Sequence, residues 1–121
     1  MSDLMIFNCS HGKEDPERAT LPFIAANIAA TAGQHVAVVC TIEAAWLGTP
    51  GGVDDIAADG LPPLKQVFAE FVANGGEVWL CSACTKPRGI TEDDCVEGAS
   101  IVGAARVVEE LASGAKAVSF A

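Results

Sequence analysis

The residues of this chain best suited to covalent chemistry are Cys81 and Cys84, which follow the apolar run Val78-Trp79-Leu80. A cysteine sulfur is nucleophilic only as the thiolate, and a nearby positive charge favours that form. Lys86 and Arg88 come directly afterwards, and they are two of only 7 lysines and arginines in the chain. This clustering of thiols and cations indicates a candidate reactive site.

The spacing of the two cysteines leaves several chemistries open. Persulfide carriage needs one exposed, activated thiol, whereas a dithiol redox couple needs both sulfur atoms within bonding range. A zinc site needs four ligands, for which the candidates are Cys9, His11, Cys81 and Cys84. No second CxxC or HxxxH accompanies the pair, so we expect no bound metal. In the remaining alternative, both cysteines are structural: Cys81 ends a core strand and Cys84 packs under a loop.

Short apolar or β-branched runs alternate with segments of helical spacing along the whole chain. The predicted strands are residues 4–9, 35–41, 77–81 and 115–120. The predicted helices are residues 16–32, 62–74 and 100–111. Because strands alternating with helices favour parallel pairing with right-handed crossovers, we expect a three-layer α/β/α sandwich. Its sheet should be mostly parallel, with four or five strands, and residues 1–121 should form a single domain.

Four details of this assignment depend on single residues or short segments. Asp15 is the expected N-cap of the first helix, and Pro22 inside that helix is expected to kink it or shift its start. Thr91 is the expected cap of a short helical turn. Residues 99–102 read equally well as a brief extra strand or as the approach to the third helix, and periodicity alone does not choose.

Ligands of parallel α/β sheets bind beyond the carboxyl ends of the strands, where the loops that follow them converge. The loops after Cys9, Thr41 and Cys81 should therefore meet at one edge. His11 is a candidate base or charge partner for the thiols. The other polar or small residues expected to line the cleft are Asn8, Ser10 and Gly12. His35, at the opposite end of the sheet, is expected to be structural.

Composition narrows the classes of function. The formal net charge is −9, so the protein repels phosphate backbones and anionic membrane surfaces, and neither nucleic acid nor membrane is an expected partner. No GxGxxG or GxxxxGK[ST] motif is present, and we expect no cofactor. The chain lacks the basic start that is typical of a secretory signal, and its five cysteines are an odd number. We therefore expect a soluble cytoplasmic protein with reduced thiols.

The segment from Cys81 to Glu92 resembles the DsrE/DsrF-like family, whose members carry a Cys-x-x-Cys or a single Cys, an Arg-Gly-hydrophobic turn and an acidic helix start. In this chain the corresponding residues are Cys81-Ser82-Ala83-Cys84, Arg88-Gly89-Ile90 and Thr91-Glu92. The likeness extends more weakly to Gly12, residues 16–19, Gly33 and residues 118–120.

The resemblance implies an α/β/α fold, homotrimers or homohexamers, and persulfide transfer by a cysteine during sulfur oxidation or transfer-RNA thiolation. Sulfur donor and acceptor proteins would be the partners, and the chain would be a sulfurtransferase component. Cys84 lies nearer Lys86 and Arg88 in sequence, so it is the preferred carrier and Cys81 the second candidate. A non-enzymatic binding or assembly subunit, or a dithiol redox protein of the same fold, is the alternative.

Overall fold

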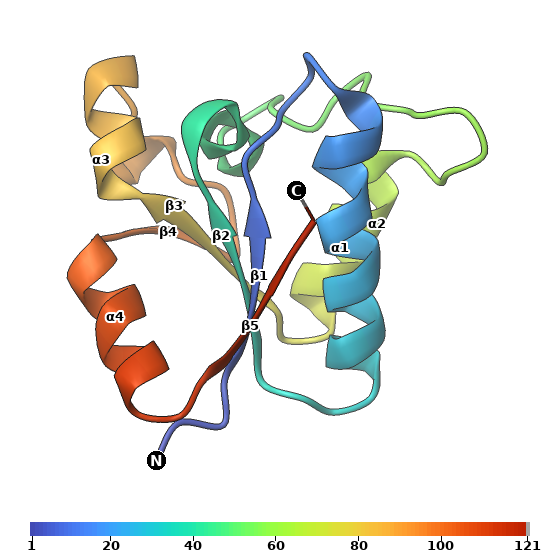
Figure 1. Cartoon of the computed structure of the whole chain (residues 1–121). Coiled ribbons are helices and arrows are strands. Elements are labelled where there is room, and N and C mark those ends of the chain that lie inside the picture. The colour runs from blue at the N-terminus through green and yellow to red at the C-terminus, as the bar shows by residue number, and fades with distance from the viewer. Residues whose placement is uncertain (121) are drawn as a thin grey trace.

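The computed structural model describes residues 1–120 and contains a five-stranded sheet in which all neighbouring strands are parallel (Figure 1). The sheet order is β4-β3-β2-β1-β5. The strands are β1 (Met5–Cys9), β2 (Val36–Cys40), β3 (Glu77–Cys81), β4 (Ala99–Val102) and β5 (Lys116–Ser119). The expected fold class is therefore confirmed, with five strands.

Helices cover both faces of the sheet, which gives three layers (Figure 1). Helices α1 (Pro16–Thr31) and α2 (Leu64–Ala73) pack side by side on one face, and α4 (Ala104–Ala112) lies on the other. Short helical segments occupy the connections: η1 (Ile42–Gly48), α3 (Ser82–Thr85), η2 (Lys86–Arg88) and η3 (Glu92–Asp94). The chain leaves β1 and β2 towards the α1 and α2 layer, and it leaves β4 towards α4.

The two faces of the sheet are packed to different extents. The larger apolar cluster lies between the sheet and α1 and α2, and it includes Phe23, Phe71 and Leu80. The smaller cluster lies on the α4 side and consists of Leu4, Ile6, Ala37, Val39 and Trp79. No residue of α4 is buried. The α4 layer is therefore held by fewer apolar contacts than the α1 and α2 layer.

Helix α1 confirms the expected cap at Asp15, whose carboxylate accepts a hydrogen bond from the backbone N–H of Arg18 at 3.1 Å. Pro22 neither ends the helix nor shifts its start, because α1 runs without a break from Pro16 to Thr31. The ring of Pro22 is buried inside this helix, where proline has no backbone N–H to donate. Thr91 is confirmed as a cap, because Thr91 and Asp94 form a reciprocal capping box around η3.

Two helix boundaries differ from the sequence prediction. Helix α2 begins at Leu64 rather than Pro62, because Pro63 disfavours helical backbone at the residue before it. Residues 100–102 are not helical: the strand alternative is confirmed, since residues 99–102 pair in parallel with β3 and the helix is confined to Ala104–Ala112. Pairing with a neighbouring strand satisfies the backbone groups of this segment, and a helical periodicity does not reveal that option.

Candidate functional site

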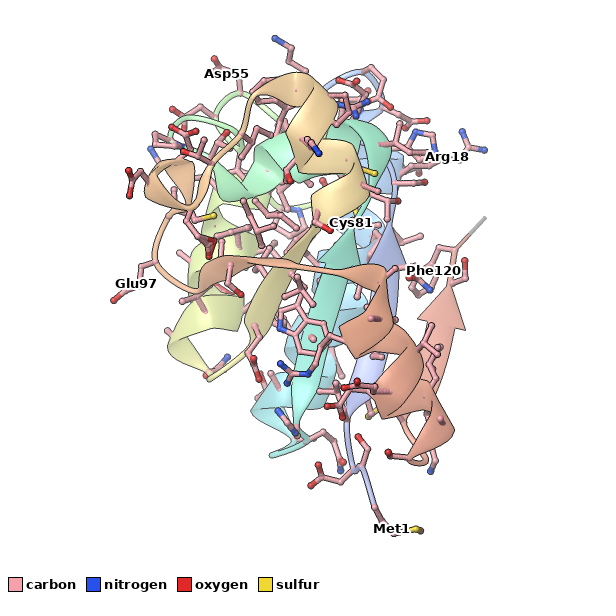
Figure 2. The ribbon with its side chains drawn as sticks, turned by 90° about the vertical axis from the view of Figure 1, so that its left-hand side faces the viewer. Met1, Arg18, Asp55, Cys81, Glu97 and Phe120 are labelled. Atoms are coloured by element: carbon pink, nitrogen blue, oxygen red, sulfur yellow. The ribbon has the colours of Figure 1, made fainter. Side chains whose placement is uncertain are left out.

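The candidate site lies where β3 ends and α3 begins. Cys81 is the last residue of β3 and is paired in register with Val102 of β4. Figure 2 shows Cys81 at the point where the strand gives way to the short helix above it. Side chains alternate between the faces of a strand, so Cys81 shares a face with Trp79, on the α4 side of the sheet. The strand therefore delivers the thiol to the less densely covered face.

Cys81 lines an apolar hollow of about 240 Å³ between the sheet and α4. The walls come from the carboxyl ends of β1, β2, β3 and β4 and from the start of α4: Asn8, Val39, Thr41, Trp79, Cys81, Val102, Ala104, Val107 and Val108. No charged side chain lines this hollow, and besides Cys81 and Trp79 its polar side chains are those of Asn8 and Thr41. A small uncharged group attached to Cys81 would therefore contact mostly apolar side chains.

Three larger hollows, of about 810, 710 and 650 Å³, lie elsewhere on the described part of the chain. Neither cysteine nor histidine lines any of them. The loop of residues 48–55 contributes to two of these hollows and not to the one beside Cys81. Among these four hollows, the smallest is the one that a cysteine lines.

Cys84 lies one helical turn beyond Cys81 but has different surroundings. Its half-buried side chain packs against the apolar cluster between the sheet and α1 and α2. Its carbonyl oxygen accepts a hydrogen bond from Arg88 Nη1 at 3.1 Å. All five cysteines are free thiols. The two thiols of the CxxC segment therefore contact different parts of the molecule.

The two cations of the segment also separate. Arg88 forms an ion pair with Glu43, at 3.0 Å between Nη2 and Oε1, and its side chain is only 23% exposed. Its charge is thus engaged by a carboxylate of η1. Lys86 is exposed, and within residues 1–120 no carboxylate lies within ion-pair distance of its ammonium group. Lys86 is therefore the cation of this segment that forms no ion pair within residues 1–120.

The loop after β1 contributes less to the site than its residue types predict. His11 Nδ1 faces Glu14 Oε2 at 2.9 Å. Partial burial raises the pKa of Glu14, but hydrogen bonds from His11 and from the Gly12 N–H outweigh it and bring the pKa below its usual value. Ser10 is half-buried in the same loop. Asn8, at the end of β1, is the residue of this group that lines the hollow beside Cys81.

Gly12 is required for packing. A Cβ atom at this position would lie 2.8 Å from the carbonyl oxygen of Glu43, closer than real Cβ contacts. The loop after β1 and segment η1 therefore approach each other backbone to backbone. This close approach fixes the carboxyl ends of β1 and β2 relative to each other.

His35 lies at the opposite end of the sheet, as expected. Its ring nitrogens contact Glu77 Oε2 at 2.9 Å and Asp3 Oδ1 at 3.1 Å. Hydrogen bonds to Glu77 and to Asp3 raise the pKa of His35 above its ordinary value. The contacts link the N-terminal segment, β2 and β3, which indicates a structural role.

Residue-by-residue reading of the sequence missed most of the hollow. Trp79 stands two residues before Cys81 on the same strand, so the two-residue period of a strand was the available signal for it. Val107 and Val108 come from a helix far along the chain, and only tertiary structure reveals them. Within residues 1–120, no group of three or more His, Cys, Asp or Glu side chains is arranged to hold a metal ion. The zinc alternative therefore has no cluster to support it.

Comparison with known protein families shows to which family the chain belongs. The model of the DsrE/DsrF-like family matches residues 3–120. The chain belongs to the DsrE/DsrF-like family. Membership in this family agrees with the expectation drawn from residues 81–92, and the match covers nearly the whole chain.

Two uncharacterized proteins are similar to this chain in sequence. The chain is 26% identical over 99 residues to the uncharacterized protein MK0008 of Methanopyrus kandleri, covering 82% of this chain and 78% of that protein. It is 25% identical over 104 residues to the uncharacterized protein MJ0760 of Methanocaldococcus jannaschii. That match covers 86% of this chain but only 38% of MJ0760, so the chain spans less than half of that relative.

Solved structures share the fold. The ychN protein of E. coli superposes with a TM-score of 0.72 at 17% identity, covering 99% of this chain and all of ychN. MTH1491 of Methanobacterium thermoautotrophicum, a protein of unknown function, also gives a TM-score of 0.72, at 18% identity over 97% of this chain and 98% of its own. In the described residues, no helix is long and apolar enough to cross a membrane.

Proposed function

We propose that this DsrE/DsrF-like chain is a cytoplasmic sulfur-relay protein that carries a persulfide sulfur on a cysteine of residues 81–84. The observation that carries the proposal is the place of Cys81, at the carboxyl end of β3 and on the wall of an apolar hollow. Membership in a family associated with sulfur relay supports the same class of function. Its partners in this proposal are a sulfur donor protein and a sulfur acceptor protein.

The relay consists of two displacements at sulfur. In the first, the thiolate of the carrier cysteine attacks the outer sulfur of a donor persulfide, and the donor S–S bond breaks with its electron pair on the departing thiolate. In the second, an acceptor thiolate attacks the outer sulfur now held by the carrier. The carrier S–S bond breaks, and the carrier cysteine leaves as a thiolate. One sulfur atom moves in each step, and no external oxidant or reductant is required.

The hollow beside Cys81 suits this chemistry. A persulfide is a reactive intermediate, and walls that limit water and free thiols around it reduce side reactions. Val39, Trp79 and Val102 provide such walls on the side of the sheet. Lys86, exposed and five residues after Cys81, adds positive charge to an otherwise acidic protein and attracts an anionic sulfur donor.

The geometry favours Cys81 over Cys84 as the carrier, the reverse of the order expected from sequence. Cys81 lines a hollow, whereas the Cys84 side chain packs against the apolar cluster on the other face and its carbonyl is held by Arg88. A carrier must also present its outer sulfur to two partners in turn, so a thiol beside open space is better suited than one packed against core side chains. Because the two thiols contact different parts of the molecule, the structure gives a dithiol couple less support than a single carrier.

One observation favours assembly into an oligomer. Val108 and Leu111 of α4 are 62% and 42% exposed, although both are large apolar residues. Apolar side chains exposed on one helix are typical of a surface covered by another subunit. We therefore propose that the chain is a homo-oligomer, a trimer or a hexamer, and this proposal is compatible with either a carrier or a purely structural subunit.

Sulfur transfer to an acceptor thiol tests the proposed function. The wild-type protein is treated with a small persulfide, freed of donor and mixed with an acceptor thiol, whose gain of sulfur is measured by mass spectrometry. Wild type and the control variant Cys95→Ser should both transfer sulfur, and the double variant Cys81→Ser/Cys84→Ser should not. Transfer by the double variant at the wild-type rate would rule out a carrier in residues 81–84.

A further inference from the structure

A second pair of thiols lies beneath the loops of the candidate site. Cys9 and Cys40 are the last residues of β1 and β2, and they are direct partners in the parallel register. The pairing continues to the strand ends, because the backbone N–H of Thr41 donates to the carbonyl oxygen of Cys9 at 2.9 Å. Neighbouring strands lie about 4.8 Å apart, which is within the Cα separation of about 4.4–6.8 Å seen in disulfides.

Both thiols point into the same layer. Cys9 and Cys40 belong to the apolar cluster under α1, and they are 2% and 0% exposed. Cys9 Sγ donates towards the carbonyl oxygens of His11 and Ala19, at 3.5 and 3.7 Å. A hydrogen bond with Cys9, together with burial, raises the pKa of the Cys40 thiol well above its ordinary value. In the closed structure the pair is therefore shielded and Cys40 stays protonated.

We propose that Cys9 and Cys40 are a redox-sensitive dithiol that closes to an intramolecular disulfide when a small neutral peroxide reaches it. One thiol, as its thiolate, attacks a peroxide oxygen, which breaks the O–O bond and gives a sulfenic acid and, after protonation, water. The second thiol attacks that sulfur, forms the S–S bond and displaces a second water. Hydrogen peroxide is the two-electron oxidant, and each thiol gives up one proton and one electron overall.

The covering segment η1 is built in a way that lets the pair become accessible. It begins at Ile42, two residues after Cys40, and Ile42 has a φ of +54°. A β-branched residue in this left-handed region is strained, and such strain lowers the free energy needed to open the segment locally. Ala44 and Ala45 of η1 are buried in the same cluster as the two thiols, so opening η1 removes part of their cover.

The ion pair between Glu43 and Arg88 opposes this opening. Glu43 lies within η1, and Arg88 lies in η2, beyond the CxxC segment. Breaking the pair releases η1 from the segment that carries Cys84. Because the two Cβ atoms of register partners must approach each other to reach disulfide geometry, the resulting bond should be strained and easily reduced. An easily reduced disulfide is typical of a redox switch, whereas a structural disulfide resists reduction.

The first test isolates the pair in the full-length chain. The variant Cys81→Ser/Cys84→Ser/Cys95→Ser is exposed to hydrogen peroxide, denatured, alkylated and analysed by intact-mass and peptide mass spectrometry. We expect loss of two hydrogen atoms, a crosslinked peptide joining Cys9 to Cys40, and recovery of both thiols with dithiothreitol. The proposal would be overturned if Cys9 and Cys40 both remained free thiols while a small reference thiol in the same tube was fully oxidised. It would also be overturned if the protein gained oxygen atoms without forming the crosslink.

Wild-type protein provides a second measurement if the triple variant does not fold. Peptide mapping after the same treatment should again join Cys9 to Cys40, and a crosslink from either residue to a different cysteine would contradict the assignment. The role of η1 in shielding the two thiols is tested with Glu43→Gln. This change removes the ion pair with Arg88 and should speed crosslinking about two- to fivefold. Glu17→Gln, on the exposed side of α1, is the matched control and should leave the rate unchanged. Equal rates for both variants would show that η1 does not govern access.

Discussion

Arg88 donates a hydrogen bond from Nη1 to the carbonyl oxygen of Cys84 at 3.1 Å. The other arm of the same guanidinium reaches Glu43 in η1. One side chain therefore joins the segment after β3 to the segment after β2. Although Arg88 was expected to act on the thiols by its charge, its contacts are those of a residue that positions the CxxC segment.

Arg88→Ala should lower the free energy of unfolding by about 1–2 kcal/mol, because a carbonyl and a carboxylate lose a charged donor. Arg88→Lys should restore only part of this loss, since one ammonium group cannot reach both acceptors as a planar fork does. Urea denaturation measures both variants. Lys86→Ala, in the same segment but exposed, is the control and should change stability by less than about 0.5 kcal/mol. Equal effects at the two positions would refute the positioning role.

His35 should make stability depend on pH. Its pKa is raised by Glu77 and Asp3, so the protonated ring stabilises the folded state. This contribution is fully present below the ordinary value of 6.5 and is lost as pH rises through the higher folded value. The stability difference between wild type and His35→Gln should thus be larger at about pH 5.5 than at about pH 8.5. Because the side chain is 47% exposed, we expect a change below about 1 kcal/mol. A difference that grows with pH would contradict this.

Replacing Ile42 should stabilise the protein. Its side chain is 54% exposed, so little burial is lost, while its φ of +54° is unfavourable for a β-branched residue. Ile42→Gly or Ile42→Asn should raise the free energy of unfolding by about 0.5–1 kcal/mol, after allowing for the greater freedom of glycine in the unfolded chain. Asp55→Gly is the matched control, since Asp55 has a φ of +62° but aspartate tolerates that region better. Thermal denaturation that shows destabilisation at Ile42 would sink the strain argument.

The exposed apolar side of α4 should be a subunit contact. Light scattering coupled to gel filtration should give a trimeric or hexameric mass for wild type and a smaller mass for Val108→Glu or Leu111→Glu, because an interface does not accept an unpaired buried carboxylate. Ala69→Glu, at an exposed position on α2 away from these apolar side chains, should leave the mass unchanged. A monomeric wild type would contradict the proposed assembly.

Local sequence patterns predicted the elements and misjudged how their side chains meet. The bounds of β3 and the cap at Asp15 follow from short-range rules of strand composition and helix capping, and both are confirmed. Residues 99–102 became a strand because β3 offered a partner, which no local period encodes. The pairing of Arg88 with Glu43 joins residues far apart in sequence, so proximity along the chain wrongly suggested a thiol as its partner.

The hollow beside Cys81 shows the same limit. The sequence indicated that reactive residues gather at the carboxyl ends of the strands, and Asn8 and Cys81 do line one cavity there. Which cysteine faces that cavity depends on the strand period at Cys81 and on how the single turn of α3 directs Cys84 towards the core. That direction is set by tertiary packing.

The central claim, that residues 81–84 carry persulfide sulfur, is tested most directly by intact-mass spectrometry after exposure to a small persulfide donor. Wild type, Cys81→Ser and Cys84→Ser are compared under identical conditions, with Cys95→Ser as the control for a half-buried thiol outside the segment. The account predicts that wild type, Cys84→Ser and Cys95→Ser each gain the mass of one sulfur atom and that Cys81→Ser does not. Absence of the adduct on wild type, or an equal adduct on all four proteins, would contradict it.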